Sequence, residues 1–534
     1  MTTPYDENGS FEPQSLRPVV VAVVPFPAQS HLNQLLQLSH VLSSHDIPVH
    51  YIGSTLHNSQ VKSRASIPLN HLTKIHFHDF QTPQFPSPNS VSKTKFPQHG
   101  LSTLKAITSL RHPIFSLLRS LSHTATRLVV VYDTFMASLV QDVISLPNAE
   151  AYCFNSASAF SCFAFVCQFL GHKDKVLIRN LPSGASCFPT LFRIFMTLQG
   201  VMSDITKSGS LFNTYRAIEG SFLDEIESNK EIFGRRKMWA LGPLLHQTTT
   251  ITNELKEEDE FLFHWLDKQE QNSVLYISFG TTTTLSDVEI RELALGLEQS
   301  GVKFVWAFRD ADKADVFCKE EWKRHDQLPN GFEERIRSLG VGMVLRNWVP
   351  QVKILGHSST GGFMSHCGWN SCMESLTMGV PMAAWPMHSD QPMNAVLITE
   401  VLKAGVAVME WKQRDELVTS SMIAMAARKL MASKEGEEIR VRVEELSKAV
   451  ERSLNEGGDN CLEWDSFVAH ISRESTSARN SKKYYNIRLK LIRTLVNFSM
   501  PLVFGMNFFI GKKKQVFVLF FSFVLSFLFL FYFQ

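Results

Sequence analysis

Residues 348–391, "WVPQVKILGHSSTGGFMSHCGWNSCMESLTMGVPMAAWPMHSDQ", carry an unusual density of polar side chains beside glycines. Within this stretch, His366, Asn370 and Ser371 offer hydrogen-bond donors around Gly368, where a strand pattern gives way to a helix pattern. A helix N-terminus presents free backbone N–H groups and the positive end of a dipole, and a glycine there allows close approach of the backbone. The turn is therefore suited to a phosphate group, although the pattern alone also fits an ordinary turn.

Other side chains of the same stretch suit the remaining parts of a sugar nucleotide. Glu374, one turn into the predicted helix, could accept hydrogen bonds from ribose hydroxyls. Trp348 has a flat face for a base. Asp390 and Gln391 have short polar side chains that suit sugar hydroxyls. A single tryptophan usually belongs to a core, so the nucleotide hypothesis depends on the whole stretch.

Two series of alternating strand and helix patterns must position these residues. The first begins with the β-branched run 19–24, a helix pattern at 31–45 and a strand pattern at 47–53, and it includes the later strand 127–133. The second begins at 272–280, and the polar segment 246–260 between them reads as a linker. The sequence thus predicts an α/β protein with two Rossmann-like, doubly wound domains facing each other across a cleft, with ligands beyond the carboxyl ends of the strands.

The expected domains are residues 18–245 and 261–472, after a disordered N-terminus at 1–17. The last helix of the second domain is expected to pack back on the first domain.

The order W-x-P-Q, H-C-G-W-N-S, E, G-V-P and D-Q over 44 residues resembles the signature box of the plant UDP-dependent glycosyltransferases of family 1. The resemblance implies the GT-B arrangement of two domains, with a UDP-sugar held mainly by the second. It implies that uracil stacks on Trp348, that Gln351 contacts the ribose or the base, and that Glu374 binds ribose. The other donor-site residues implied are Val349 in the box, Thr281, His366, Gly368, Asn370 and Ser371 at the phosphates, and Trp369, Asp390 and Gln391 at the sugar. In that family, glutamine at the last position is associated with glucose over galactose.

Transfer of a sugar to an alcohol needs a base for the acceptor proton, and the box contains no candidate. His31 follows the first strand pattern and Asp133 ends a later one, so both can lie at one edge of a parallel sheet. An aspartate that fixes the tautomer of a histidine and stabilises its cation is a general device. By itself His31 could equally be a polar residue at a helix start, but the family resemblance implies a His31–Asp133 catalytic dyad and an inverting displacement. The family usually has glycine where Ser30 stands, and a serine would strain that turn if the turn required a positive φ.

Beyond the box, stretches such as "PFPAQSHLNQLLQLSHVLSSHDIPVHYIG" and "IHFHDF" resemble zeatin O-glycosyltransferases in particular, over residues 15–472. This resemblance implies a cytokinin acceptor glycosylated on its side-chain hydroxyl, with UDP-glucose as the expected donor and UDP-xylose as the alternative. Another phenolic or terpenoid alcohol, or UDP-sugar binding without turnover, remains open. An adenine-based acceptor needs an aromatic pocket, which residues 154–169 could line, although a core helix is favoured there.

Two further motifs resemble metal sites. Asp310 and Asp312 lie in a charged loop, and His76 and His78 alternate with apolar residues on a strand that ends near Asp79. A solvated loop and an exposed strand face explain them better than ligand sets do. We therefore expect no metal and no permanently bound cofactor.

Composition sets the remaining expectations. The chain has 534 residues, of which 44% are hydrophobic. Its eight cysteines include no CxxC pair, and its polar N-terminus does not resemble a signal peptide. We therefore expect a cytoplasmic protein with reduced thiols. A mildly acidic body argues against nucleic-acid binding. Residues 473–534 hold ten Lys/Arg and one acidic residue, and 516–533 carry no charge. This tail is either a membrane anchor or a gene-model extension, that is, untranslated DNA that was conceptually translated. The extension is the favoured interpretation. A membrane partner is therefore expected only if the tail is real.

Overall fold

The computed structural model describes residues 17–64, 74–83, 96, 103–104, 106–171, 181–245, 257–309 and 328–473. Four predicted features lie outside the described residues: most of the N-terminal segment 1–17, most of the linker 246–260, the pair Asp310 and Asp312, and all but the first residue of the tail 473–534.

The first sheet has seven parallel strands in the order β3-β2-β1-β4-β5-β6-β7. Val21 in β1 pairs with Val49 in β2 and with Val129 in β4, and all three are fully buried. The β-branched runs predicted as two-sided buried strands therefore form the centre of the sheet. The strands are β1 (Arg17–Val24), β2 (Val49–Ser54), β3 (Ile75–Phe80), β4 (Ala125–Asp133), β5 (Ala149–Asn155), β6 (Gly209–Phe212) and β7 (Lys237–Ala240).

The helices that alternate with these strands differ in length and role. The longer ones are α1 (Gln29–Ser44), α2 (Thr55–Ser63), α5 (Arg111–Thr124), α7 (Ala159–Phe169), α9 (Thr190–Thr206) and α10 (Arg216–Ser228). Short helices are α6 (Ala137–Val140), α8 (Gly184–Cys187) and α11 (Lys230–Phe233), and single turns lie at η1 (Thr108–Leu110), η2 (Thr134–Met136) and η3 (Gln141–Ser145).

The second sheet has six parallel strands in the order β10-β9-β8-β11-β12-β13. The strands are β8 (Val274–Ser278), β9 (Lys303–Ala307), β10 (Gly342–Leu345), β11 (Thr360–Ser365), β12 (Met382–Ala384) and β13 (Gly405–Ala407). The helices are α12 (Glu257–Leu266), α13 (Asp287–Ser300), α14 (Phe332–Ser338), α15 (Gln351–Leu355), α16 (Trp369–Thr377), α17 (Gln391–Val396), α18 (Ser420–Ala432), α19 (Lys434–Leu454) and α20 (Asp459–Ser472), with short turns at η5 (Leu397–Val401) and η6 (Trp411–Gln413).

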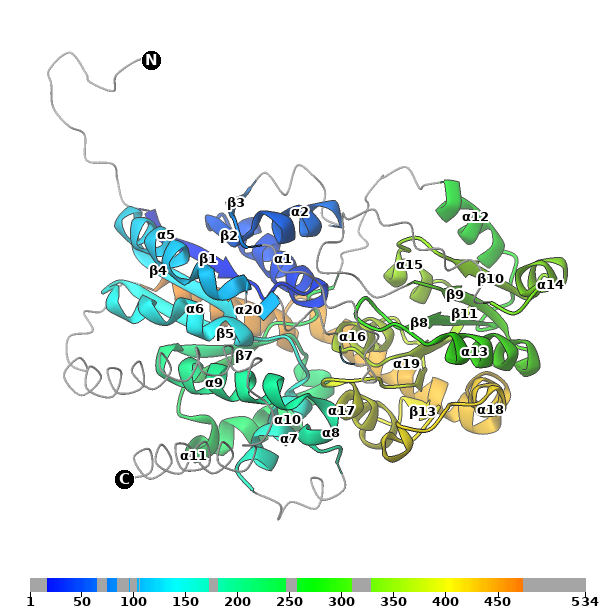
Figure 1. Ribbon diagram of the computed structural model, residues 1–534. Coiled ribbons are helices and arrows are strands. Elements are labelled where there is room, and N and C mark those ends of the chain that lie inside the picture. The colour runs from blue at the N-terminus through cyan, green and yellow to red at the C-terminus, as the bar shows by residue number, and fades with distance from the viewer. Residues whose placement is uncertain are drawn as a thin grey trace, which may run out of the picture. The chain divides into compact units, whose positions relative to one another are not determined.

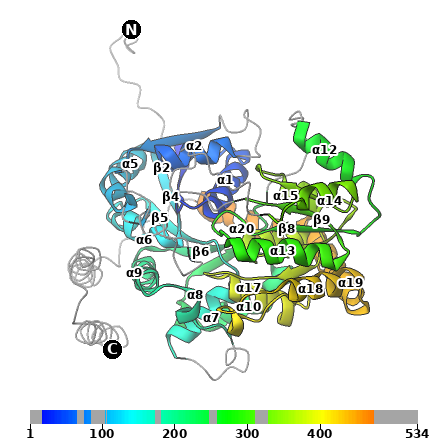
Figure 2. The same cartoon turned by 45° about the vertical axis from the view of Figure 1, so that its right-hand side comes forward.

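Helix α20 leaves the second half of the chain and packs against the first sheet, where Figures 1 and 2 show it in orange beside the blue strands. Phe467 and Ile471 are fully buried in the same cluster as Val21 and Trp239. The indole N–H of Trp239 donates to Ser466 Oγ at 3.2 Å. The last described helix thus ties the two halves of the chain together.

Three sequence details bear on the site. Ser30 is the second residue of α1 and is not among the residues with positive φ, so serine causes no backbone strain there. Helix α7 buries Phe160 and Phe163 in the core, as favoured for residues 154–169. On β3, Ile75 is buried and His76 is exposed, as the alternation predicts, whereas Phe77 and His78 are both half-buried. Within the described ranges no helix is long and apolar enough to cross a membrane.

Candidate active site

His31 and Asp133 come together at the carboxyl edge of the first sheet. Val24, the last residue of β1, pairs with Tyr132 of β4, so the chain leaves both strands at the same level. His31 lies in the first turn of α1, and its Nδ1 is 2.7 Å from Asp133 Oδ2. The Asp133 side chain is fully buried, whereas that of His31 is 18% exposed. The structure therefore gives the predicted pair a direct hydrogen bond and leaves the histidine accessible.

The surroundings of Asp133 hold it in place. Its Oδ1 accepts from the backbone N–H of Phe135 at 2.9 Å, and its Oδ2 also accepts from Ser156 Oγ at 2.7 Å. Burial is the largest influence on His31 and opposes its protonation, but the charge and hydrogen bond of Asp133, with a smaller attraction from Asp390, raise the pKa of His31 above its usual value. The environment thus favours an imidazole that can accept a proton and carry the resulting charge.

An aromatic cluster lies beside this pair. The ring of His31 contacts Phe26 at a centroid distance of 5.2 Å and Phe135 at 5.7 Å. From Phe135, ring contacts continue to Phe192 at 5.4 Å and to Phe195 at 6.1 Å. Sequence reasoning missed this cluster and looked at residues 154–169 instead. The phenylalanine spacing in "FPTLFRIF" at the start of α9 was the available signal.

The predicted phosphate turn joins β11 to α16. Gly368 is the N-cap of α16, so the first N–H groups of the helix lie at this turn. A Cβ atom at Gly368 or at Gly280 would stand 2.5 Å from Nε2 of His366, so both glycines make room for that ring. Burial lowers the pKa of His366 to about 4, and its imidazole is therefore neutral near pH 7. This turn therefore offers an anion the N–H groups at the start of α16 and a neutral imidazole that can donate one hydrogen bond.

The predicted ribose residues contact one another. Gln351 Nε2 donates to Glu374 Oε2 at 2.6 Å and to Ser371 Oγ at 3.1 Å. Tyr276 donates its hydroxyl to Gln351 Oε1 at 3.3 Å. Burial raises the pKa of Glu374 to about 7, although the bond from Gln351 favours the ionised form. The carboxyl group therefore changes its charge near neutral pH.

Trp348 lies between β10 and α15 and is 38% exposed. The guanidinium groups of Arg64 and Arg309 lie over its ring, at 4.7 and 4.9 Å from the centroid. Val349 is half-buried, and its backbone carbonyl accepts from the N–H of Gln351 at 2.9 Å. An exposed, electron-rich face at this position can take a flat, polar ring.

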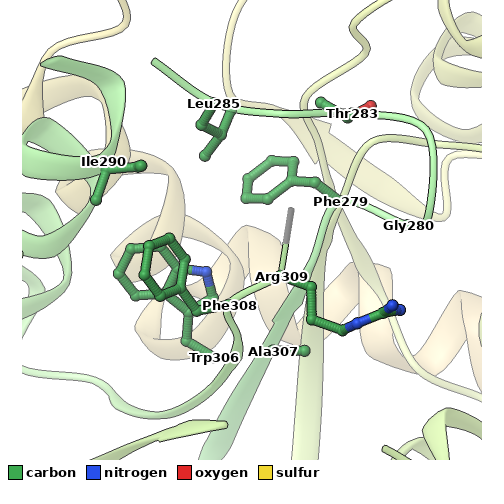
Figure 3. Close-up of a pocket in the computed structure, with 9 residues that line it drawn as sticks. All are labelled: Phe279, Gly280, Thr283, Leu285, Ile290, Trp306, Ala307, Phe308 and Arg309. Carbon is green, nitrogen blue, oxygen red and sulfur yellow. The ribbon is translucent and has the colours of Figure 1, made fainter. Parts of the chain in front are cut away.

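A small pocket beneath the loop that carries Thr281 lies at the carboxyl ends of β8 and β9 (Figure 3). Phe279, Leu285, Ile290 and Trp306 make most of its wall, and Figure 3 shows the Arg309 guanidinium directed away from these rings. Gly280, Thr283 and Arg309 also line the pocket, which lies directly beside the loop that carries Thr281.

The predicted sugar residues have defined partners. Asn394 Nδ2 donates to Asp390 Oδ2 at 2.8 Å, and burial raises the pKa of Asp390. Gln391 Oε1 accepts from the backbone N–H groups of Met387 and His388, at 2.9 and 3.0 Å. The indole N–H of Trp369 donates to the carbonyl of Asn213 in the first domain at 2.7 Å, and the side chain is buried. The backbone N–H of Trp369 is therefore the group through which it could reach a sugar.

Within the described ranges, no group of three His, Cys, Asp or Glu side chains is arranged to hold a metal ion. The His50 and His78 rings on β2 and β3 stack at 5.1 Å and share a hydrogen bond of 2.8 Å. The expectation of a metal-independent reaction stays a prediction.

The two halves of the chain match two family models. Residues 17–246 match the glycosyltransferase N-terminal domain, and residues 243–448 match the UDP-glucoronosyl and UDP-glucosyl transferase family. Together with two parallel-sheet α/β domains, these matches define a UDP-glycosyltransferase with the GT-B fold.

Curated relatives agree with this class. The chain is 47% identical over 460 residues to a zeatin O-glucosyltransferase of Phaseolus lunatus, covering 85% of this chain and 97% of the relative. It is also 47% identical over 460 residues to a zeatin O-xylosyltransferase of Phaseolus vulgaris, covering 85% and 98%. The chain belongs to the plant UDP-glycosyltransferase family.

Solved structures show the same fold. The Phytolacca americana UGT2 complex with UDP-2fluoro-glucose and pterostilbene is 25% identical, with a TM-score of 0.68, and the match covers 85% of this chain and 100% of that one. A UGT transferase from Siraitia grosvenorii in complex with UDP is 26% identical, with a TM-score of 0.67 and the same coverage.

Proposed function

We propose that this enzyme transfers glucose from UDP-glucose to the side-chain hydroxyl of zeatin, with inversion at the anomeric carbon. The observation that carries the proposal is the 2.7 Å bond between His31 and Asp133, because it joins an accessible histidine to a buried carboxylate beside the aromatic cluster. The 47% identity to a zeatin O-glucosyltransferase supports the choice of acceptor.

The proposed step is a single displacement. With its Nδ1–H bonded to Asp133, neutral His31 has an unprotonated Nε2 that takes the proton from the acceptor hydroxyl. The oxygen forms a bond to the anomeric carbon as the bond from that carbon to the diphosphate oxygen breaks. The negative charge passes to UDP, while the proton remains on the imidazole, whose cation Asp133 stabilises.

The donor would lie along the second domain. Uracil would stack on Trp348 by displacing one of the two guanidinium groups, with Val349 and Gln351 beside it. Glu374 would accept from ribose hydroxyls. The start of α16, with His366, Gly368, Asn370, Ser371 and the loop at Thr281, would hold the diphosphate, and helix N–H groups stabilise a leaving phosphate without a metal. Trp369, Asp390 and Gln391 would contact the sugar.

The aromatic cluster supports a planar acceptor. Phe26 and Phe135 touch His31, and Phe96 contacts both Phe192 and His388, which is two residues before Asp390. An adenine ring can stack among such side chains while its hydroxylated side chain reaches His31.

UDP-xylose is the second candidate donor, because the identity to a zeatin O-xylosyltransferase is also 47%. Xylose lacks the hydroxymethyl group of glucose, so the choice depends on the space near Asp390 and Gln391. The association of Gln391 with glucose over galactose supports glucose among hexose donors and does not separate glucose from xylose. None of the seven described cysteines forms a disulfide bond, which supports the cytoplasmic location that we also propose.

A matrix of donors and acceptors tests this function. The full chain is incubated with UDP-glucose or UDP-xylose as the donor and with trans-zeatin, cis-zeatin, a phenol or a terpenoid alcohol as the acceptor. Each reaction is run with and without EDTA, and the products are identified by their mass in a mass spectrometer. We expect a hexosyl-zeatin product from UDP-glucose, in an amount that EDTA does not lower. A pentosyl product would assign UDP-xylose, and products on the other alcohols alone would refute the zeatin assignment.

A further inference from the structure

A buried amide pair joins the starts of two helices from different domains. Gln34 lies one turn after His31 on α1 and is 1% exposed. Its Nε2 donates to the side-chain Oδ1 of Asn370 at 2.5 Å and to the backbone carbonyl of Ser156 at 3.2 Å. In return, Asn370 Nδ2 donates to the backbone carbonyl of Ser30 at 3.1 Å. The start of α1 and the start of α16 are therefore bonded directly.

Only one assignment of the oxygen and NH2 ends of these two amides satisfies all three hydrogen bonds. A backbone carbonyl can only accept, so the end of Gln34 that faces Ser156 must be its NH2 group. That group then requires an acceptor on Asn370, which must turn its Oδ1 toward Gln34. The NH2 group of Asn370 is left facing the carbonyl of Ser30, which again can only accept. Two carbonyls thus fix the orientation of both amides.

The same bonds lead to the catalytic pair. Ser156 offers its carbonyl to Gln34 and donates its hydroxyl to Asp133 Oδ2 at 2.7 Å. Asp133 bonds His31, and Ser30 is the residue that precedes His31. Asn370 is therefore connected to the His31–Asp133 pair on both sides, through Gln34 and through Ser30.

We propose that Gln34 is a positioning residue that orients the amide of Asn370 for the donor diphosphate and sets α16 in register with His31. The proposal rests on the proposed role of Asn370 at the diphosphate. An Asn370 NH2 group has a second hydrogen beyond the one given to Ser30, and it can donate that hydrogen to a phosphate oxygen. Without Gln34, only the bond to the Ser30 carbonyl holds the Asn370 amide, so the amide rotates more readily and can present Oδ1 to the anion, which replaces an attraction with a repulsion.

Two variants and a matched control test Gln34. Gln34→Met keeps the length of the side chain without any donor, and Gln34→Glu keeps its shape with a group that cannot donate when ionised. Gln199→Met is the control, since Gln199 is also 1% exposed and bonds only to Ser138 in the contacts described for it. The dissociation constants of UDP and of uridine are measured by calorimetry, and melting curves verify that each variant folds.

We expect either Gln34 variant to raise the dissociation constant of UDP about tenfold, as for the loss of one hydrogen bond to a charged group. The dissociation constant of uridine should not change. Gln199→Met should change neither constant. In the double variant with Asn370→Ala, Gln34→Met should add no further loss, because its effect passes through Asn370. Unchanged UDP affinity in both Gln34 variants, an equal loss for uridine, or additive losses would overturn the inference. If Asn370→Ala alone leaves UDP affinity unchanged, the role proposed for Asn370 fails first.

Discussion

Replacing Asp133 with asparagine tests the catalytic pair without removing bulk from a fully buried position. The backbone N–H of Phe135 requires an acceptor, so the Asn oxygen should take the place of Oδ1 and the NH2 group that of Oδ2. That NH2 group then faces His31 Nδ1, which must accept. The neutral imidazole consequently carries its proton on Nε2, where it cannot take one from the acceptor.

The loss of rate should be large. General base catalysis contributes about 10²–10⁴-fold, and Asp133→Asn should lower kcat by an amount in this range. The pH profile should move as well. In the natural enzyme kcat/KM falls as the pH drops through the raised pKa of His31. Without the carboxylate, burial is opposed far less and lowers that pKa, so the residual activity should persist to more acidic pH.

The assay is kcat/KM for the acceptor from about pH 5 to pH 9, with UDP affinity measured in parallel. Asp142→Asn is the matched control, because Asp142 binds Arg111 at 2.8 Å and has no described contact with His31. It should leave the profile unchanged. If Asp133→Asn retains the natural rate, or loses rate with no shift of the acid limb, the assignment of Asp133 is wrong.

Three further results are expected. Burial raises the pKa of Glu374 to about 7, so uridine, which has no phosphate that titrates in this range, should bind more weakly as the pH falls through 7. Glu374→Gln should abolish this dependence, and a pH-dependent affinity of the variant for uridine would contradict the ribose assignment. Gly280→Ala places a Cβ 2.5 Å from His366 Nε2 at a φ of +71°. The variant should lose about 1–2 kcal/mol of unfolding free energy in a denaturation experiment. It should also bind UDP more weakly in calorimetry. Phe467→Ala should cost about 3–5 kcal/mol in urea unfolding, whereas exposed Leu462→Ala should cost little; similar losses would refute the packing of α20.

The sequence alone could predict the parallel sheets and which segments form the two parts of the candidate site, because each depends on local patterns. The run 19–24 is rich in β-branched residues and forms a strand buried on both faces. His31 comes after β1, and Asp133 is the last residue of the adjacent parallel strand β4. The order of residues in the 348–391 stretch likewise fixes the turn before α16.

What could not be predicted depends on contacts between distant segments. Nothing near Gln34 indicates that it bonds Asn370, 336 residues further along the chain. Similarly, Phe135 and Phe192 belong to different elements, so their shared wall beside His31 follows from packing and not from a local pattern. The backbone strain considered for Ser30 does not arise, because this residue lies inside α1 and needs no positive φ.

The stereochemistry of transfer tests the central claim most directly. If His31 activates the acceptor hydroxyl for one displacement, the α-linked sugar of UDP-glucose must emerge as a β-glucoside. The anomeric coupling constants in the NMR spectrum of the purified glucosyl-zeatin report this configuration. We predict a β-linked sugar on the side-chain oxygen. An α-linked product would require two displacements or a front-face reaction and would contradict the role given to His31 and Asp133.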